Sequence, residues 1–399
     1  MSEQVAGMRD LLPETRKRER EMLRLLGRFV RCESPSGDKA AVDRFGAMVA
    51  REWRRRGAKV KILKQRLRGN HLRVEMVAEA RRELGRRERH GADPDDGQIL
   101  VLGHLDTVYP IGTIAKMPFR VRGGRAWGPG TFDMKGGLVL ALAAVDALRA
   151  VGVRPRKRVV FLWTSDEEVG SETSRRAIES EARRSDAVLV LEPALGREGR
   201  LKTERKGVGG AEIVVTGRAA HAGIEPEKGV NAVHELALQI ARLMKMNYRA
   251  RGITVQATVV EGGTASNVVP ERARAAVDIR FARVADAGRI ERELRGLRPI
   301  LRGVRVEMWV GGMRPPLERS AGVRELFGVA RGLMKEIGLS LGEAATGGGS
   351  DGNFTAALGV PTLDGLGAVG DGAHSLREHV VVREMGVRAA LIAGLLARV

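Results

Sequence analysis

The feature that most constrains this chain is a short apolar run, residues 99–102, that ends in the sequence Gly-His-Leu-Asp. A continuous apolar run of this length is typical of a strand buried on both faces of a sheet. His104 and Asp106 would then lie at the carboxyl end of that strand, where ligands bind in open α/β sheets. The chain is therefore expected to hold a buried parallel strand with polar side chains at its end.

A second polar residue follows shortly afterwards. Asp133 lies in the glycine-rich segment 128–137, directly before the apolar segment 138–148, which predicts a buried helix. Histidine and aspartate together suit zinc or a similar divalent ion. A core histidine and a turn aspartate would look the same, so this stretch alone leaves a metal site and a structural role open.

Two further predicted strands also end in carboxylates. Strand 158–163 runs into Asp-Glu-Glu at 166–168, and strand 187–191 runs into Glu192. Strands that alternate with helices predict a mostly parallel sheet. Carboxylates gathered at one edge of such a sheet would repel one another unless a cation held them. The three strand ends together favour a metal site over a structural role.

The chain has 399 residues, a length that indicates about two domains. From about residue 207 the expected elements follow the order βαββαβ, the split βαβ arrangement. We expect a catalytic domain in two segments, 1–206 and 314–399, with the domain 207–313 inserted between them. The inserted strands are expected at 209–217, 253–260, 272–281 and 304–310, and its helices at 229–245 and 285–297.

Two periodic patterns predict which side chains of the inserted domain are buried. In strand 272–281 the alternate apolar residues would face the helices, leaving Arg272, Arg274, Asp278 and Arg280 on the open face. In helix 229–245 an apolar stripe that includes Val233 and Leu236 would face the sheet.

Composition restricts the class of protein. The net charge is +20, but the arginines are spread along the whole chain and are not interleaved with aromatic residues, so no nucleic-acid partner is expected. Arginine-rich solvated faces would instead attract anionic substrates. One cysteine, no signal peptide and no run of about 18 apolar residues predict a cytoplasmic protein without a membrane span. Residues 8–31 are expected to form one amphipathic helix, and 84–97 an exposed loop.

Seven short motifs stand in the order found in one enzyme family. They are GHLDTV at 103–108, GPG, Asp133 and KGG within 128–137, DEE at 166–168, AHAG at 220–223, SNVVP at 266–270, GGGSD at 347–351 and HS at 374–375. Together they resemble the co-catalytic zinc metallopeptidase family of bacterial glutamate carboxypeptidase, the aminoacylases, acetylornithine deacetylase and succinyl-diaminopimelate desuccinylase. The resemblance covers nearly the whole chain and is strongest to the glutamate carboxypeptidase branch.

The resemblance implies a fold and a metal centre. The fold would be α/β, with a mostly parallel-sheet catalytic domain of the zinc exopeptidase type and a ferredoxin-like βαββαβ lid and dimerisation domain. His104 and Glu192 would bind one zinc ion, and Glu168 and His374 would bind the other. Asp133 would bridge the two ions. Carboxylate-rich pairs of this kind also accept cobalt or manganese.

The resemblance also implies roles in catalysis and substrate binding. Glu167 would be the general base, and Asp106 would orient His104. His221 would stabilise the oxyanion that forms on attack. Arg280 would hold the α-carboxylate of the substrate, and Asn267 would contact the same end.

Two details of the resemblance can be checked in a structure. The peptide bond between Asp133 and Met134 is expected to be cis, as it typically is in the family. Met134 itself departs from close relatives, which often carry a second acidic residue there. His71, His90, His234 and His379 stand in no motif and are expected to be structural or solvent-facing.

The expected activity is removal of a C-terminal amino acid, with glutamate as the first candidate, from a small peptidyl or N-acyl substrate. The expected assembly is a homodimer through the inserted domain. An N-acyl amino acid deacylase or dipeptidase of the same family is the alternative. A more distant alternative is a metal-free binding protein on the same scaffold, with nucleic acid as a ligand for its arginines.

Overall fold

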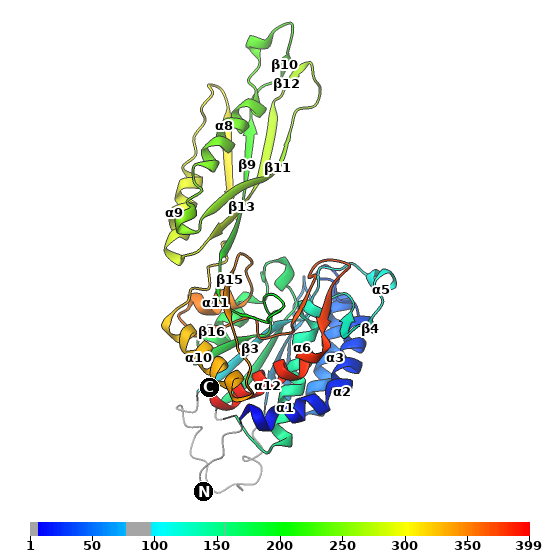
Figure 1. Ribbon diagram of the computed structural model, residues 1–399. Helices are drawn as coiled ribbons and strands as arrows, with labels where there is room; N and C mark the ends of the chain where they lie inside the picture. Colours follow the sequence, from blue (N-terminus) through cyan, green and yellow to red (C-terminus); the bar gives the residue numbers. More distant parts are fainter. Residues whose placement is uncertain (1–6, 77–96, 156) are drawn as a thin grey trace. The chain divides into compact units, whose positions relative to one another are not determined.

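The computed structural model describes residues 7–76, 97–155 and 157–399, and its contacts divide the chain into two compact units. Unit 1 comprises residues 1–203, 319–345 and 350–399, and unit 2 comprises 204–318 and 346–349. The divisions lie a few residues from the boundaries expected after 206 and 313, and the short segment 346–349 belongs to unit 2. Figure 1 shows both units and labels many of their elements.

Unit 1 is built on a six-stranded sheet with the order β1-β2-β6-β3-β7-β16. Its strands are β1 (Lys59–Leu63), β2 (His71–Glu75), β3 (Gln98–His104), β6 (Arg158–Thr164), β7 (Ala187–Val190) and β16 (Thr362–Leu363). Strand β3 runs parallel to β6 and β7, and β16 runs parallel to β7, whereas β1 and β2 are antiparallel. The predicted mostly parallel sheet is confirmed. Most of the loop expected at 84–97, with His90, lies outside the described residues.

Helices cover both faces of this sheet (Figure 1). Ile99 and Val101 of β3 pack into the larger core cluster, whereas Leu100 and Leu102 pack into a second cluster on the opposite face. All seven residues of β3 are buried, which confirms the prediction for this strand. The larger cluster draws on α1 (Met8–Lys17), α2 (Glu19–Arg31), α3 (Lys39–Arg55), α6 (Gly136–Ala150), α10 (Ala321–Glu336) and α12 (Val382–Arg398), and the second on α7 (Arg175–Ala182) and α11 (Gly352–Ala357).

The single helix expected at 8–31 is wrong, because the chain breaks at Arg18 into α1 and α2. The N–H of Arg18 bonds the carbonyl of Thr15 only three residues back. The Thr15 hydroxyl in turn donates to the carbonyl of Gly386 in α12 at 2.8 Å. This long-range contact anchors the end of α1, and an amphipathic pattern that continues through the break cannot reveal it.

A smaller antiparallel sheet in unit 1 was not predicted. It joins β4 (Arg120–Arg122), β5 (Arg125–Trp127), β18 (His379–Val381) and β17 (Gly370–Asp371). It places the segment before Asp133 beside the two strands that flank His374. Strands of two or three residues are too short to show a periodic pattern, but this sheet brings two predicted ligand segments together. Other short elements are α5 (Thr113–Lys116) and the pair β8 (Leu201–Arg205) and β15 (Glu343–Thr346).

Unit 2 has the predicted βαββαβ order. Its elements are β9 (Gly207–Thr216), α8 (Ala232–Met244), β11 (Thr254–Gly262), β13 (Arg272–Phe281), α9 (Val284–Arg295) and β14 (Arg305–Val310). The sheet is antiparallel with the order β11-β13-β9-β14, which confirms the ferredoxin-like arrangement. A separate short pair joins β10 (Ala220–His221) to β12 (Val268–Val269).

The burial patterns of unit 2 confirm one prediction and correct another. The residues of β13 alternate as predicted, with the apolar side chains buried and Arg272 and Arg274 exposed. In α8, however, Val233 is 38% exposed, whereas Glu235 and Gln239 are buried. Glu235 is tolerated there because its carboxylate accepts the N–H groups of residues 300 and 301. No helix among the described residues is long and apolar enough to cross a membrane.

Candidate metal centre and active site

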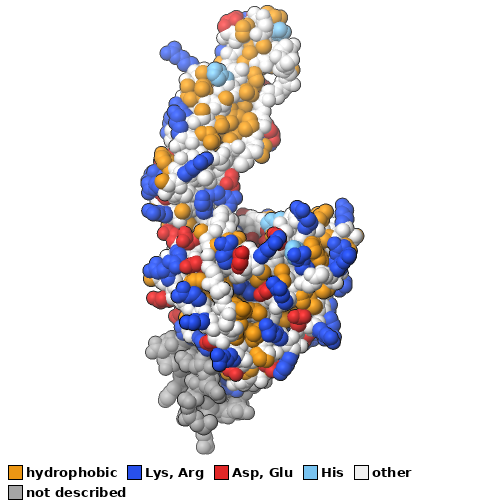
Figure 2. Space-filling model, in the orientation of Figure 1, with side chains coloured by type: hydrophobic (Ala, Val, Ile, Leu, Met, Phe, Trp, Pro, Cys, Tyr) orange, Lys and Arg blue, Asp and Glu red, His pale blue; other side chains and the backbone are white. Residues whose placement is uncertain are grey.

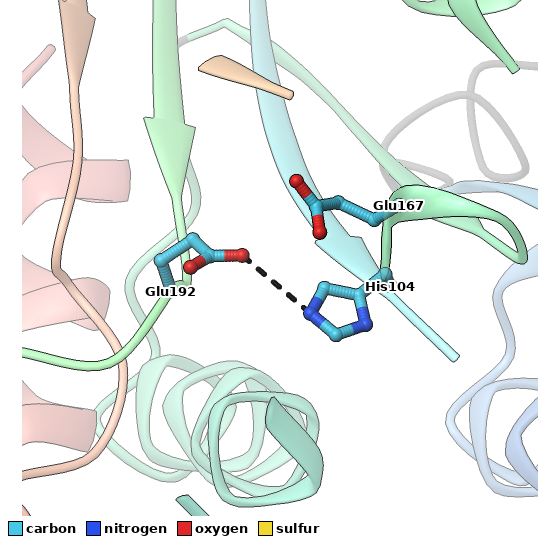
Figure 3. Close-up of side chains that lie close together, drawn as sticks. All are labelled: His104, Glu167 and Glu192. Atoms are coloured by element: carbon cyan, nitrogen blue, oxygen red, sulfur yellow. Dashed lines mark ion pairs between the residues drawn. The ribbon is translucent and has the colours of Figure 1, made fainter. Parts of the chain in front are cut away.

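Three strand ends converge at one edge of the large sheet. Strand β3 ends at His104, β6 is followed by the one-turn helix η2 (Glu167–Val169), and β7 ends two residues before Glu192. Because β3 runs parallel between β6 and β7, these ends meet at the same edge. Figure 3 shows the side chains of His104, Glu167 and Glu192 turned toward one another.

His104 is buried and held on both ring nitrogens. Its Nε2 lies 3.1 Å from Oδ1 of Asp133 and 3.5 Å from Oε1 of Glu192. Its Nδ1 lies 2.9 Å from the backbone carbonyl of Asp106 and 3.5 Å from the Asp106 carboxylate. The second nitrogen of a metal-binding histidine commonly donates in this way, and this fixes the ring with Nε2 facing the other ligands.

Asp133 lies between the two histidines. It sits in the turn η1 (Thr131–Lys135) before α6, and its Oδ2 is 3.4 Å from Nε2 of His374. The two carboxylate oxygens therefore face different histidines, as a bridging ligand requires. The peptide bond between Asp133 and Met134 is cis, which confirms that prediction. Gly137 lets α6 approach closely, because a Cβ there would lie 2.4 Å from the carbonyl oxygen of Leu191.

His374 and Glu168 complete the group. Nε2 of His374 lies 3.3 Å from Oε2 of Glu168, and the other oxygen of Glu168 is buried without a hydrogen-bond partner in the described part of the chain. His374 has a backbone φ of +60°, a left-handed conformation that is strained for a residue with a side chain. Its side chain is 51% exposed, so it is the open side of the group.

The charges of this group are coupled. Hydrogen bonds to Asp133 and Glu168 raise the pKa of His374 to about 10. Burial works to lower the pKa of His104, but its carboxylate neighbours outweigh burial and hold that pKa well above its ordinary value. Burial raises the pKa of Glu168. Protons on the imidazoles thus balance the carboxylates, and a bound divalent cation would replace those protons.

The Asp106 carboxylate has closer partners than His104. Its two carboxylate oxygens accept the backbone N–H groups of Glu167 at 3.3 Å and Glu168 at 3.2 Å. The hydroxyl of Ser36 donates to the same carboxylate at 2.7 Å. Asp106 therefore also holds the turn that carries both glutamates. Ser36 was not predicted, because a serine in a Pro- and Gly-containing turn carries no signal of a partner 70 residues away.

A second residue that sequence reasoning missed is Glu378. Its buried carboxylate accepts the backbone N–H groups of Phe132 and Asp133, directly beside the bridging aspartate. The surrounding sequence, Leu-Arg-Glu-His, is typical of an exposed loop, so composition could not have identified it. Only its spacing of four residues from His374 offers a signal.

The three remaining predicted residues belong to unit 2. His221 is exposed on β10, and its Nδ1 accepts the N–H groups of residues 223 and 224 at 3.1 Å each, which leaves Nε2 as the N–H donor. The carbonyl of Asn267 accepts the N–H of Ala222 at 2.8 Å, so these two segments lie together. Arg280 forms a bidentate pair with Asp278 and donates to the carbonyl of Gly347 at 3.2 Å. Their roles stay predictions.

The donor set fits a divalent metal. Two imidazoles meet three carboxylates, from Asp133, Glu168 and Glu192, at histidine–carboxylate distances of 3.1–3.5 Å, and one oxygen of Glu168 is buried without a partner in the described part of the chain. These are the ligand types that zinc and similar ions take. The α/β fold and this group of side chains define a candidate metal centre in an α/β protein.

Comparison with known proteins identifies the family. Residues 100–398 match the model of peptidase family M20/M25/M40, and the chain therefore belongs to this family of metallohydrolases. It is 37% identical to carboxypeptidase G2 of Pseudomonas sp. (strain RS-16) over 280 residues, 69% of this chain and 68% of the relative. It is 32% identical to succinyl-diaminopimelate desuccinylase of Dechloromonas aromatica, over 70% of this chain and 78% of the relative. The solved structure of aminopeptidase PepT from Bacillus cereus has the same fold, with a TM-score of 0.75, 21% identity and coverage of 95% and 98% of the two chains.

Proposed function

We propose that this chain is a dinuclear zinc carboxypeptidase that releases a C-terminal amino acid, with glutamate as the preferred residue, from peptidyl or N-acyl substrates. The observation that carries the proposal is the position of Asp133, which presents one carboxylate oxygen to each of two histidines. The 37% identity to a protein named carboxypeptidase G2 supports a carboxypeptidase, and the choice of glutamate rests on the resemblance of the motifs to the glutamate carboxypeptidase branch.

In this proposal, His104 and Glu192 would hold one ion, Glu168 and His374 would hold the second, and Asp133 would contribute to both. Bound metal would supply Lewis-acid chemistry, which makes water a stronger nucleophile and polarises the scissile carbonyl. Zinc is the first candidate, and cobalt or manganese would suit the same carboxylate-rich ligands.

Glu167 is the proposed general base. Its carboxylate lies close enough to His104 and Glu192 that these three residues also form a possible ligand group. We assign the ligand role to Glu168 instead, because Glu168 contacts the second histidine and has a buried oxygen without a partner in the described chain. Glu167 is then left to take a proton from the attacking water and deliver it to the nitrogen of the leaving amino acid.

Residues of unit 2 would bind the substrate. The planar guanidinium of Arg280 suits a bidentate pair with the α-carboxylate, and the Asp278 carboxylate already holds that guanidinium in place. The Nε2–H of His221 would donate to the oxyanion, because Nδ1 of this ring is occupied as an acceptor. Asn267 would contact the same end of the substrate.

Unit 2 would also form the homodimer. Strand β11 is an edge strand, and Val259 and Val260 on it are 53% and 55% exposed. On the face seen in Figure 2, hydrophobic side chains gather over the region of α8 and β11. An exposed apolar edge strand is able to pair with a second chain.

Sedimentation of the Val260→Lys variant tests this proposal. We expect a monomer, whereas Ile62→Lys on the edge strand β1 of unit 1 should leave the dimer intact. A monomeric wild type, or a dimeric Val260→Lys variant, would contradict it.

Two of the sequence-based predictions concern partners and location. The same view shows lysine and arginine scattered among acidic and apolar side chains, which supports a solvated surface over a continuous basic track for nucleic acid (Figure 2). A cytoplasmic location stays a prediction based on the single cysteine, Cys32.

The alternative is an N-acyl amino acid deacylase or dipeptidase, which the similarity to the desuccinylase supports. A screen of the zinc-loaded protein separates the two activities. Acyl-glutamates of the folate type, the same acyl group on other C-terminal amino acids, and N-acetyl amino acids are compared by kcat/KM. Highest turnover on the acyl-glutamate is expected. Preference for the N-acetyl amino acids would favour the deacylase. If no amide is hydrolysed, the result would favour the metal-free binding protein.

A further inference from the structure

The centre of unit 1 contains a carboxylate to which the proposed mechanism gives no role. Glu378 is fully buried, and its carboxylate accepts four hydrogen bonds. One oxygen accepts the N–H groups of Phe132 at 2.7 Å and Asp133 at 2.9 Å. The other accepts the Tyr109 hydroxyl at 2.5 Å and the N–H of Gly130 at 3.1 Å. A buried carboxylate with this many donors is satisfied without a basic partner.

These four bonds join three segments that carry predicted ligands. Tyr109 lies five residues after His104, the donors Gly130–Asp133 form the turn of the bridging aspartate, and Glu378 itself lies four residues after His374. The Tyr109 hydroxyl also contacts the carbonyl of Ser375 at 2.9 Å, next to His374. Glu378 is thus the point at which the loops of His104, Asp133 and His374 are tied together.

The contacts also limit what can replace the carboxylate. Three of the four partners are backbone N–H groups, which can only donate, and together they reach both oxygens, so each oxygen must accept at least one hydrogen bond. Burial raises the pKa of Glu378 to about 7, and the Tyr109 hydroxyl and the two backbone donors oppose that rise. A glutamine has nearly the same shape, but its NH₂ group would face donors in place of one oxygen.

We propose that Glu378, together with Tyr109, is a positioning residue for the metal centre. It sets the direction of the Asp133 carboxylate through the backbone N–H groups of residues 132 and 133, and it fixes the His374 loop to the same turn. It touches neither substrate nor reacting atoms in this role. The inference rests on the proposed function, because it assumes that Asp133 and His374 bind metal.

The test is Glu378→Gln, measured by zinc affinity in a competition with a chelator and by the visible absorption spectrum of the cobalt-substituted protein. Loss of a residue that orients metal ligands typically weakens metal binding or activity about 10- to 100-fold. We expect a loss of zinc affinity of that size and an altered cobalt spectrum, which reports ligand geometry. Glu52→Gln, at another buried carboxylate far along the chain, is the matched control and should change neither readout.

Tyr109→Phe provides a second, milder variant in case Glu378→Gln does not fold. It removes one of the four donors and leaves the three N–H groups, so roughly a 3- to 10-fold loss of zinc affinity is expected. The inference is overturned if the cobalt spectrum and the zinc affinity are both unchanged in whichever of the two variants folds. A wild-type protein that binds no metal would instead refute the proposed function, so the two failures are distinguishable.

Discussion

Glu167 and Glu168 are neighbours in the chain, and both carboxylates lie near His104. They differ in their other partners, because Glu168 also lies beside Asp133 and His374, whereas Glu167 lies beside Glu192. Asp106 holds the backbone N–H groups of both. One buried carboxylate thus fixes the turn that carries both side chains.

The assignment of Glu167 as general base predicts the effect of Glu167→Gln. The variant should keep its metal, because no ligand is removed, and should lose about 10²- to 10⁴-fold in kcat, the usual contribution of general base catalysis. The measurement is kcat with metal content determined on the same sample. Glu172→Gln, at an exposed position of the same loop, is the control. Metal loss in Glu167→Gln would mean that Glu167 is a ligand.

Some residues of the candidate site could be identified from the sequence, and others could not. The five proposed ligands follow apolar runs or stand in motifs, and the structure brings all five together. Ser36 and Glu378 were missed because their partners lie 70 and about 245 residues away in the chain. Local patterns carry no information on such pairs, which depend on how the whole unit packs.

At the scale of elements, β2 carries a buried histidine that links it to the turn after β6. Nδ1 of His71 lies 2.9 Å from the Ser165 hydroxyl, and Nε2 lies 3.2 Å from the Thr173 hydroxyl. Burial lowers the pKa of His71 below its ordinary value. The folded chain therefore binds fewer protons at this ring than the unfolded chain once the pH falls to about 6.5 and below.

This predicts a loss of stability in acid. Because the unfolded state binds more protons, the free energy of unfolding should fall as the pH falls through about 6.5. Above that pH, His71 should have no such destabilising effect. The thermal midpoints of the wild type and His71→Gln, compared between pH 5 and 8, measure this. The thermal midpoint of the wild type should fall further on acidification than that of the variant, because all other titrating groups are present in both proteins. Parallel pH profiles would contradict the prediction.

Long strands were predictable and short ones were not. The alternation in β13 and the buried run of β3 were read correctly, because many residues share one period. The sheet that holds β17 and β18 was missed, although it places the His374 loop beside the Asp133 turn. The break at Arg18 was also missed, because it is fixed by contact with α12 and not by local sequence.

At the scale of the whole molecule, the chain combines a parallel-sheet unit that holds the candidate metal ligands with a ferredoxin-like unit that holds the predicted substrate residues. The overall architecture was predictable because the order of strands and helices along the chain allows few topologies. Substrate preference was not, because it depends on side chains from separate segments whose arrangement no local pattern specifies.

The central claim is that His104, Asp133, Glu168, Glu192 and His374 hold two metal ions. The most direct measurement is a calorimetric titration of the chelator-treated protein with zinc, with metal content checked after dialysis. The account predicts two ions per chain and protons released on binding, since the imidazole pKa values are raised in the metal-free group. A correctly folded protein that binds no zinc, cobalt or manganese would contradict it.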